Sequence, residues 1–197
     1  MIYFDNYSFG ICLILDIRDL EFIFEQSKEF IMAKVIYKFG DDISTDIIYP
    51  GRYMATVLPT ETPRFAFADI KELNEKLNTK QVPPGSIIVG GKNFGCGSSR
   101  EQAVSTLKGY EIIIIARNFA RIFFQNSINL GLQTITCPDI EANEGDELDI
   151  TAGEVVNKTN GKSFRIEPIP KARQAIIEAG GLIAYTRKRV KEKASIR

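Results

Sequence analysis

The sequence predicts an α/β fold, a compact domain that ends in a β-rich C-terminal part. Between residues 34 and 137, short apolar runs bounded by turn residues alternate with segments of helical periodicity, an order typical of an α/β layer. Residues 144–170 instead alternate polar and apolar side chains around Ala152-Gly153 and Asn160-Gly161, which predicts antiparallel strands with tight turns. A chain of 197 residues, 44% of them hydrophobic, is long enough to bury the core of such a domain.

Each element follows from a local pattern. Residues 41–63 contain several prolines and are expected to form a long loop. The run EIIIIA at residues 111–116 is continuously apolar, as in a strand that is covered on both faces. In chain order, we expect strands at residues 34–40, 86–91, 111–116 and 133–137, and helices at residues 64–78, 99–109, 118–131 and 171–181.

The beginning of the chain differs in character from the rest. Its apolar run ends at Asp16, far short of the ~20 apolar residues of a membrane span. The lack of an early basic segment argues against a signal peptide. Residues 19–34 have the pattern of an amphipathic helix. We therefore expect residues 1–31 to be an N-terminal extension or a misassigned start, residues 32–197 to form the domain, and the protein to work in the cytoplasm without a membrane partner.

Composition excludes several classes of function. Lys+Arg and Asp+Glu are 25 each, so no overall field favours nucleic acid or a membrane surface as a partner. Cys12, Cys96 and Cys137 lie far apart, which indicates neither a disulfide framework nor a metal site within this chain. Cys96 is expected to be a small filler and Cys137 a core residue. The sequence has no histidine, which excludes Ser-His-Asp and Cys-His nucleophilic machinery within this chain.

Residues 90–109, GGKNFGCGSSREQAVSTLKG, contain the strongest functional signal. A strand that enters a glycine-rich turn and then a helix leaves the first N–H groups of the helix unpaired, and these form an anion site. Gly95 and Gly97 would let the backbone approach a ligand, and Ser98 or Ser99 can cap the helix. Arg100 offers a planar fork suited to a carboxylate or a phosphate. The alternative is a tight turn with a serine cap and a surface arginine.

The type of anion follows by elimination. The G-x-G spacing lacks the third glycine of a dinucleotide-binding fingerprint, and Lys92 precedes the glycines, whereas the lysine of a P-loop follows them. The serines do not fit G-x-S-x-G either, and no histidine could activate them. A small di- or tricarboxylate is the best remaining match.

The same loop resembles a known family. NFGCGSSREQA, residues 93–103, closely resembles the GSSRE loop in the swivelling domain of the aconitase superfamily. The resemblance continues through DDISTDIIYPGRYMAT, ARNFARIFFQNSINLGL and EAGGLIAYTRKRV, and it covers roughly residues 33–190. The order and spacing of these motifs are similar to those of the small subunits of 3-isopropylmalate dehydratases (isopropylmalate isomerases) and of the related homoaconitases.

The resemblance implies a fold, a partner and a reaction. The expected fold is a swivelling β/β/α domain, like the fourth domain of aconitase. In this family the small subunit closes over a large subunit that carries a [4Fe–4S] cluster, so we expect a heterodimer and no cofactor bound by this chain. The implied reaction interconverts 2-isopropylmalate and 3-isopropylmalate, both hydroxy-dicarboxylates, by dehydration and rehydration in leucine biosynthesis.

The resemblance also implies roles by motif position. Ser98 is expected to be the catalytic base that takes the proton alpha to a carboxylate, and Asp46 an acidic catalytic residue. A free serine is a very weak base, so this role requires an alkoxide stabilised by Arg100, the helix terminus and a dry closed site. The expected substrate-binding residues are Ser99 and Arg100 for the carboxylates and Tyr53, Met54, Ala55 and Thr56 for the variable side group.

The sequence departs from the family pattern at three positions. Gln102 stands where many relatives have His, and Gln125 where many have Arg. Ala55 replaces an arginine that is frequent in isopropylmalate-type loops, which leaves room for an apolar side group. Two alternatives stay open: a homoaconitase or dimethylmalate-type hydro-lyase subunit, and a non-catalytic carboxylate-binding module. A neighbouring gene for a cluster-bearing large subunit would separate the enzymes from the module.

Overall fold

The computed structural model describes residues 31–151 and 153–195. The elements are, in chain order, β1 (Ile31–Lys38), α2 (Thr45–Ile48), the 3-10 helices η1 (Gly51–Tyr53) and η2 (Thr62–Phe65), α3 (Lys71–Asn78), β2 (Ile87–Gly90), α4 (Glu101–Lys108), β3 (Ile113–Ala116), α5 (Arg121–Leu130), β4 (Thr134–Thr136), β5 (Glu147–Ile150), β6 (Glu154–Asn157), β7 (Lys162–Arg165), α6 (Lys171–Glu178) and α7 (Leu182–Ala194). Within these ranges, no helix combines the length and the apolar character that a membrane crossing requires.

The described strands form one sheet in the order β4-β3-β2-β1-β5-β6-β7. Strands β1 to β4 are parallel, as the expected alternation of strands and helices requires. On its other edge β1 pairs antiparallel with β5, from Ile31 opposite Ile150 to Lys34 opposite Glu147. Strands β5 to β7 continue as an antiparallel meander. β1 therefore joins the parallel half of the sheet to the predicted β-rich C-terminal part.

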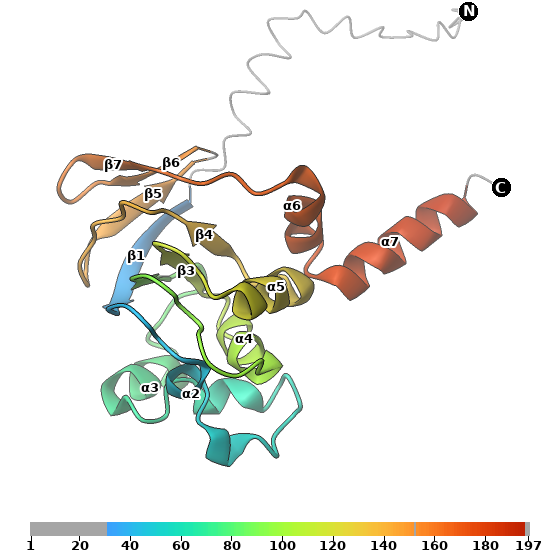
Figure 1. Ribbon diagram of the computed structural model, residues 1–197, viewed down its shortest axis with the longest axis horizontal. Helices are drawn as coiled ribbons and strands as arrows, with labels where there is room; N and C mark the ends of the chain where they lie inside the picture. Colours follow the sequence, from blue (N-terminus) through green and yellow to red (C-terminus); the bar gives the residue numbers. More distant parts are fainter. Residues whose placement is uncertain (1–30, 152, 196–197) are drawn as a thin grey trace, which may run out of the picture.

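The sheet is curled, and helices cover one of its sides. In Figure 1, β5 to β7 lie above the parallel strands, and α2 to α5 lie on the opposite side. After β7, the backbone N–H of Glu167 donates to the carbonyl oxygen of Thr136 in β4 at 2.9 Å, so the chain reaches the far edge of the sheet. The β/β/α layering expected for a swivelling domain is confirmed.

The central strands separate two hydrophobic cores because successive side chains of a strand point to opposite faces. Ile88 and Ile114 pack in the core on the helical side, whereas Ile87 and Ile113 pack in the core inside the curl. All four are buried, which explains the continuous apolar runs in the sequence. Cys137 lies fully buried in the second core, as expected, and burial raises the pKa of its thiol to about 11.

The prediction for residues 64–78 was only partly correct. A helix was expected over the whole segment, but α3 begins at Lys71. Phe67 adopts a positive φ of 50°, which a helix does not accommodate. The side-chain amide of Asn74 donates to the carbonyl oxygens of Arg64 and Ala66 at 3.1 and 2.7 Å, which stabilises the turn before the helix. Tertiary contacts of this kind have no signature in the local periodicity.

Two further predictions need correction. The long loop expected at residues 41–63 contains the short helices α2 and η1 and the beginning of η2. The amphipathic helix expected at residues 19–34 lies mostly outside the described residues, but its last four residues belong to β1. The expected extension at residues 1–31 also lies outside the described residues, except for Ile31.

Two glycines separate the expected helix α6 from α7, a helix that was not predicted. Gly180 and Gly181 have φ values of 85° and 120°, which glycine adopts at little cost. The side-chain ammonium of Lys108 donates to the carbonyl oxygens of Gly131 and Gly180 at 2.9 and 3.3 Å, so this turn is held against the end of α5. Beyond it, α7 extends away from the body of the domain (Figure 1).

Candidate active site

The glycine loop, residues 91–100, connects β2 to α4. Gly95 and Gly97 have φ values of 81° and 90°, in the left-handed region that favours glycine. A Cβ on Gly95 would lie 2.1 Å from Cγ of Phe123, so the loop packs directly on α5. The nearest atom to a Cβ on Gly97 would be the Thr45 hydroxyl oxygen, at 3.5 Å. The backbone conformation therefore favours glycine at both positions, and close packing on Phe123 additionally requires it at Gly95.

Hydrogen bonds join the glycine loop to the chain segment that precedes α2. The N–H groups of Gly95 and Cys96 donate to the carbonyl oxygen of Ile43 at 2.7 and 3.1 Å. In return, the N–H of Thr45 donates to the carbonyl oxygen of Cys96 at 2.8 Å. The Thr45 hydroxyl donates to the carbonyl oxygen of Ser98 at 3.0 Å. The DDISTD motif and the glycine loop, distant in sequence, thus form one structural unit.

The beginning of α4 differs from the expectation in one respect. Ser98 or Ser99 was expected to cap the helix, but the N-cap residue is Arg100, and no side chain caps the helix. The Arg100 N–H donates to the carbonyl oxygen of Ser98 at 2.8 Å, which turns the chain so that both serines are exposed. The serine hydroxyls do not serve as caps. The first N–H groups of α4 lack a side-chain partner, as an anion site requires.

Arg100 forms an ion pair with Asp46 of α2. The nitrogen that binds Asp46, Nη1, also donates to the carbonyl oxygen of Tyr49 at 3.3 Å. The side chain of Arg100 is 16% exposed and that of Asp46 is 56% exposed, so solvent reaches the pair mainly at the carboxylate. Within the described residues Nε and Nη2 have no hydrogen-bond acceptor, and an incoming carboxylate could use these donors.

Gly51 leaves space beside this ion pair. A Cβ at this position would lie 3.3 Å from Nη2 of Arg100 and 3.5 Å from Oδ1 of Asp46. A larger side chain would therefore crowd the guanidinium on the side where a ligand would bind. Gly51 was not among the expected site residues, and neither was Thr45. Both belong to the DDISTDIIYPGRYMAT motif, which was the available signal.

The segment from Tyr53 to Thr56 is held by a buried tyrosine. The hydroxyl of Tyr49 donates to the carbonyl oxygen of Tyr53 at 3.1 Å and lies 3.4 Å from that of Thr56. Burial raises the pKa of Tyr49. The ring of Tyr53 stacks on Phe65, with 4.1 Å between the ring centroids. These contacts give the segment a defined conformation, and Tyr49 connects it to Arg100.

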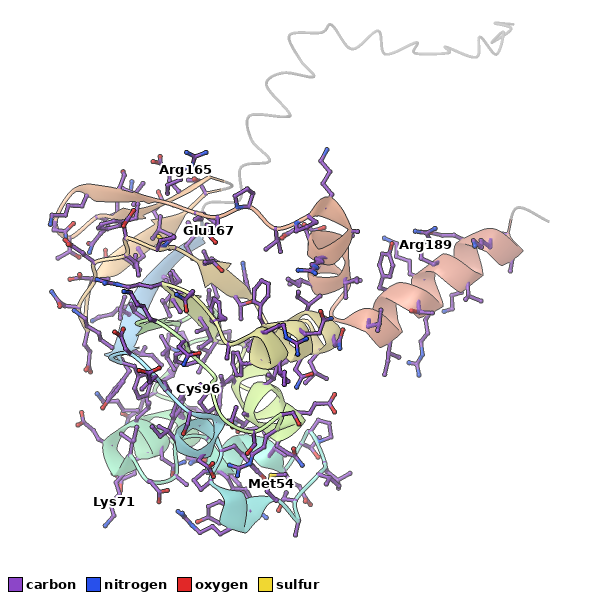
Figure 2. All side chains as sticks on the ribbon, viewed as in Figure 1. Met54, Lys71, Cys96, Arg165, Glu167 and Arg189 are labelled. Atoms are coloured by element: carbon purple, nitrogen blue, oxygen red, sulfur yellow. The ribbon has the colours of Figure 1, made fainter. Side chains whose placement is uncertain are left out.

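The remaining residues of this segment differ in exposure. Met54 is half-buried and packs against the core on the helical side, whereas Ala55 is exposed. Figure 2 shows Met54 and Cys96 on the helical side of the sheet, away from Arg165 on β7. The structure thus brings together Asp46, the glycine loop and the start of η1. The hydrogen bonds of the Arg100 side chain go to Asp46 and Tyr49 and not to the Tyr53–Thr56 side chains.

Neither described cysteine belongs to a metal site. Cys96 is half-buried and Cys137 is buried, and both are free thiols. Among residues 31–151 and 153–195, no group of three or more Cys, Asp or Glu side chains is arranged to hold a metal ion. Cys12 lies outside the described residues. Gln125, at one of the divergent positions, donates its side-chain amide to Oδ1 of Asn129 at 3.1 Å.

The comparisons with known proteins agree with this architecture. The family description of the aconitase C-terminal domain matches residues 41–140. A 3-isopropylmalate dehydratase small subunit of Methanosarcina mazei is 43% identical over 161 residues, which covers 80% of this chain and 97% of the relative. An isopropylmalate/citramalate isomerase small subunit of Methanocaldococcus jannaschii is 44% identical over 162 residues, which covers 80% of this chain and 94% of the relative.

A solved structure extends this similarity to the fold. The crystal structure of a 3-isopropylmalate dehydratase from Methanocaldococcus jannaschii superposes with a TM-score of 0.77 at 38% sequence identity, covering 85% of this chain and 99% of that chain. The layered sheet and the glycine loop thus define a swivel-type domain of the aconitase superfamily. Within that class, the chain belongs to the family of 3-isopropylmalate dehydratase small subunits.

Proposed function

We infer that this chain is the small subunit of a hydro-lyase that isomerises 2-isopropylmalate and 3-isopropylmalate in leucine biosynthesis. The observation that carries this inference is the family membership, with identities of 43% and 44% over nearly the whole length of two relatives. The local geometry supports it, because the start of α4 and the free side of Arg100 offer donors for the carboxylates of a hydroxy-dicarboxylate.

We assign the chemistry of the small subunit to Ser98. In this proposal, its deprotonated oxygen takes the proton from the carbon alpha to a substrate carboxylate and returns a proton during rehydration. The N-terminus of α4 and Arg100 favour the alkoxide, and closure against a partner would exclude water. Support comes from the exposure of Ser98, whose hydroxyl does not cap α4.

We assign substrate binding to Ser99, Arg100 and the segment from Tyr53 to Thr56. Arg100 would bind a carboxylate through Nε and Nη2, while Asp46 keeps Nη1 in place. Asp46 is also proposed as an acidic catalytic residue, supported by its exposure at the mouth of the site. The exposed Ala55 leaves space for the isopropyl group.

The proposal requires a large subunit. The relatives are named as small subunits, which implies a partner of that kind. A [4Fe–4S] cluster held by the large subunit would supply the Lewis acid for departure of the hydroxyl group. The free thiols of Cys96 and Cys137 are compatible with the reducing cytoplasm that we propose as the compartment.

Reconstitution tests this function. The full chain would be purified alone and together with the large subunit encoded by the same organism. Each preparation would be assayed with 2-isopropylmalate, citramalate, homoaconitate and dimethylmalate under anaerobic conditions. We expect the chain alone to be colourless and inactive, and the complex to convert 2-isopropylmalate with the highest kcat/KM. Iron-dependent activity of the isolated chain, or a complex that ignores 2-isopropylmalate, would contradict the proposal.

A further inference from the structure

A charged cavity borders the hydrophobic core inside the curl. This core lies on the face of the sheet opposite to the helices and the glycine loop. The cavity has a volume of about 670 Å³ and opens where the ends of β1 and β2 meet the turn between β6 and β7. Val89 and Ile140 line it and belong to the core inside the curl. Ser98, Ser99 and Arg100 do not line it. Its volume falls within the range typical of small-molecule pockets.

Positive charge predominates around this cavity. Lys38 at the end of β1, Arg117 just after β3 and Lys162 at the start of β7 all line it. Its lining carboxylates are those of Asp41 and Glu141. Three separate strands thus bring cations to one opening, although the chain as a whole has a net charge of zero.

Both carboxylates already have partners. Oδ1 of Asp41 accepts the backbone N–H of Lys92 at 2.7 Å, and Glu141 forms an ion pair with Lys162 at 2.6 Å. Lys38 donates to a neutral acceptor instead, Oδ1 of Asn143, at 2.9 Å. Within the described residues, neither Lys38 nor Arg117 has a carboxylate within ion-pair distance. In this part of the chain Lys38 and Arg117 therefore have no carboxylate partner, and the lining keeps a net positive charge because its three cations outnumber the two carboxylates.

A partly buried network orders the residue that accepts the hydrogen bond of Lys38. The N–H of this acceptor, Asn143, donates to Oδ2 of Asp146 at 2.9 Å. The same oxygen accepts the side-chain amide of Asn157 at 2.7 Å, and Asn157 is fully buried. A lysine that is already held in place loses less conformational freedom when it binds a ligand.

The walls next to Arg117 are also ordered. The N–H of Arg117 donates to the carbonyl oxygen of Gly91 at 3.1 Å. A Cβ on Gly91 would lie 2.1 Å from Oδ1 of Asp41, so only glycine allows the chain after β2 to pass this close to the Asp41 carboxylate. The backbone of Arg117 is thus held at the tightly packed carboxyl end of β2 and β3.

The electrostatics of Glu141 agree with this arrangement. Its hydrogen bond to Lys162 is the main reason that its pKa lies below the usual range, and Arg117 and Lys38 lower it further. The three cations therefore act on one point in the cavity. An anion in the adjoining space would be attracted by Lys38 and Arg117, while Glu141 stays paired with Lys162.

We propose that this cavity binds a small organic dianion through Lys38 and Arg117, with carboxylate or phosphate oxygens as the recognised groups. Each of these two side chains can bind one anionic group of the ligand, and the planar fork of arginine suits either type of oxyanion. The cavity is separate from Ser98 and Arg100, so this binding site does not depend on the proposed function of the chain.

The test uses the full chain carrying Arg100→Gln, which removes the main anion ligand of the first site. Binding of malate, of glycerol 3-phosphate and of the monoanion acetate would be measured by titration calorimetry. The cavity variant adds Lys38→Gln and Arg117→Gln. The matched control adds Lys34→Gln and Arg165→Gln, which remove the same charges outside the cavity; Figure 2 shows Arg165 on β7.

We expect saturable binding of at least one dianion and at least about tenfold weaker binding of acetate, since charge-assisted hydrogen bonds are lost. The cavity variant should bind that dianion at least about tenfold more weakly, and the control within about twofold of the parent. Tighter binding of malate would identify dicarboxylates as the ligands, and tighter binding of glycerol 3-phosphate would identify phosphate esters. Absent saturation, acetate binding as tight as the dianion, or equal losses in both variants would overturn the proposal.

Discussion

The guanidinium of Arg100 and the carboxylate of Asp46 form an ion pair between residues that are 54 positions apart in the sequence. The pair connects the glycine loop to α2, next to the carbonyl oxygen of Tyr49. It holds one nitrogen of the guanidinium and leaves the others for a ligand. Arg100 is therefore oriented before substrate arrives, which reduces the entropy lost on binding.

Arg100→Lys tests whether the planar fork matters. A lysine keeps the charge but cannot contact Asp46 and a substrate carboxylate in the same plane. In the assembled enzyme we expect kcat/KM to fall about tenfold to a hundredfold, the equivalent of one charge-assisted hydrogen bond of about 1.5–3 kcal/mol. Arg165→Lys, on the exposed face of β7, is the control and should leave kcat/KM unchanged. An unaffected Arg100→Lys enzyme would show that this side chain does not bind substrate.

Gly95→Ala tests the packing of the glycine loop on α5. The alanine would adopt a positive φ and place its Cβ 2.1 Å from Phe123, so the loop must move. Gly85→Ala is a matched control, with a φ of 80° and no atom within 4 Å of the added carbon. In denaturant unfolding we expect the control to lose about 1 kcal/mol of stability from backbone strain and Gly95→Ala about 2–4 kcal/mol. Equal losses would contradict the packing argument.

Removal of residues 1–30 tests the domain boundary. We propose that the domain is complete from Ile31, where pairing with Ile150 begins. A chain that starts at Ile31 should unfold within about 2 °C of the full chain. A chain that starts at Val35 lacks the four β1–β5 pairs from Ile31 to Lys34 and should unfold several degrees lower. A loss of several degrees in the first variant would place part of residues 1–30 in the domain.

Ala55→Arg tests whether the loop at Ala55 determines which substrate side group is accepted. Ala55 is exposed on a loop that Tyr49 anchors at both ends, so the fold should tolerate arginine. The wild-type complex should prefer isopropylmalate to homoaconitate, because a third carboxylate without a partner is costly to desolvate. The substitution should shift the ratio of kcat/KM toward homoaconitate by about tenfold, equivalent to one new charge-assisted contact.

Val57→Arg is the control for this experiment, because it adds the same charge two residues away at a position that is 66% exposed. It should leave the preference unchanged. A wild-type complex with the higher kcat/KM for homoaconitate would contradict the argument from Ala55, as would an equal shift in both variants.

The sequence predicted the strands better than the chain between them. Ile88 and Ile114 lie in strands whose apolar runs are long enough to identify them without tertiary information. The turn around Phe67 depends on the amide of Asn74, which binds the carbonyl oxygen of Ala66 eight residues earlier, and local periodicity does not report such a contact. Helix α7 has no buried residues, so its sequence carries no clear apolar stripe, and the helix was not predicted.

The candidate site was predictable in part. The glycines and Arg100 could be found from the strand–turn–helix pattern, because the physics of a helix N-terminus is local. The pairing of Arg100 with Asp46 was not, since it depends on the hydrogen bonds between Thr45 and the glycine loop. The cavity beside Lys38 and Arg117 was also missed, because three strands distant in sequence supply its cations.

The central claim is that Ser98 is the catalytic base of an isopropylmalate isomerase. Its most direct test is to measure turnover of 2-isopropylmalate by the complex of this chain with its large subunit, for the wild type and for Ser98→Ala. The Thr45 hydroxyl binds the backbone oxygen of Ser98, so the variant keeps this contact and should fold and associate normally. Because proton abstraction is lost, we predict that kcat falls by about a hundredfold or more, while the exposed β7 control Ser163→Ala retains the wild-type rate. A Ser98→Ala complex with a near-normal rate would contradict the account.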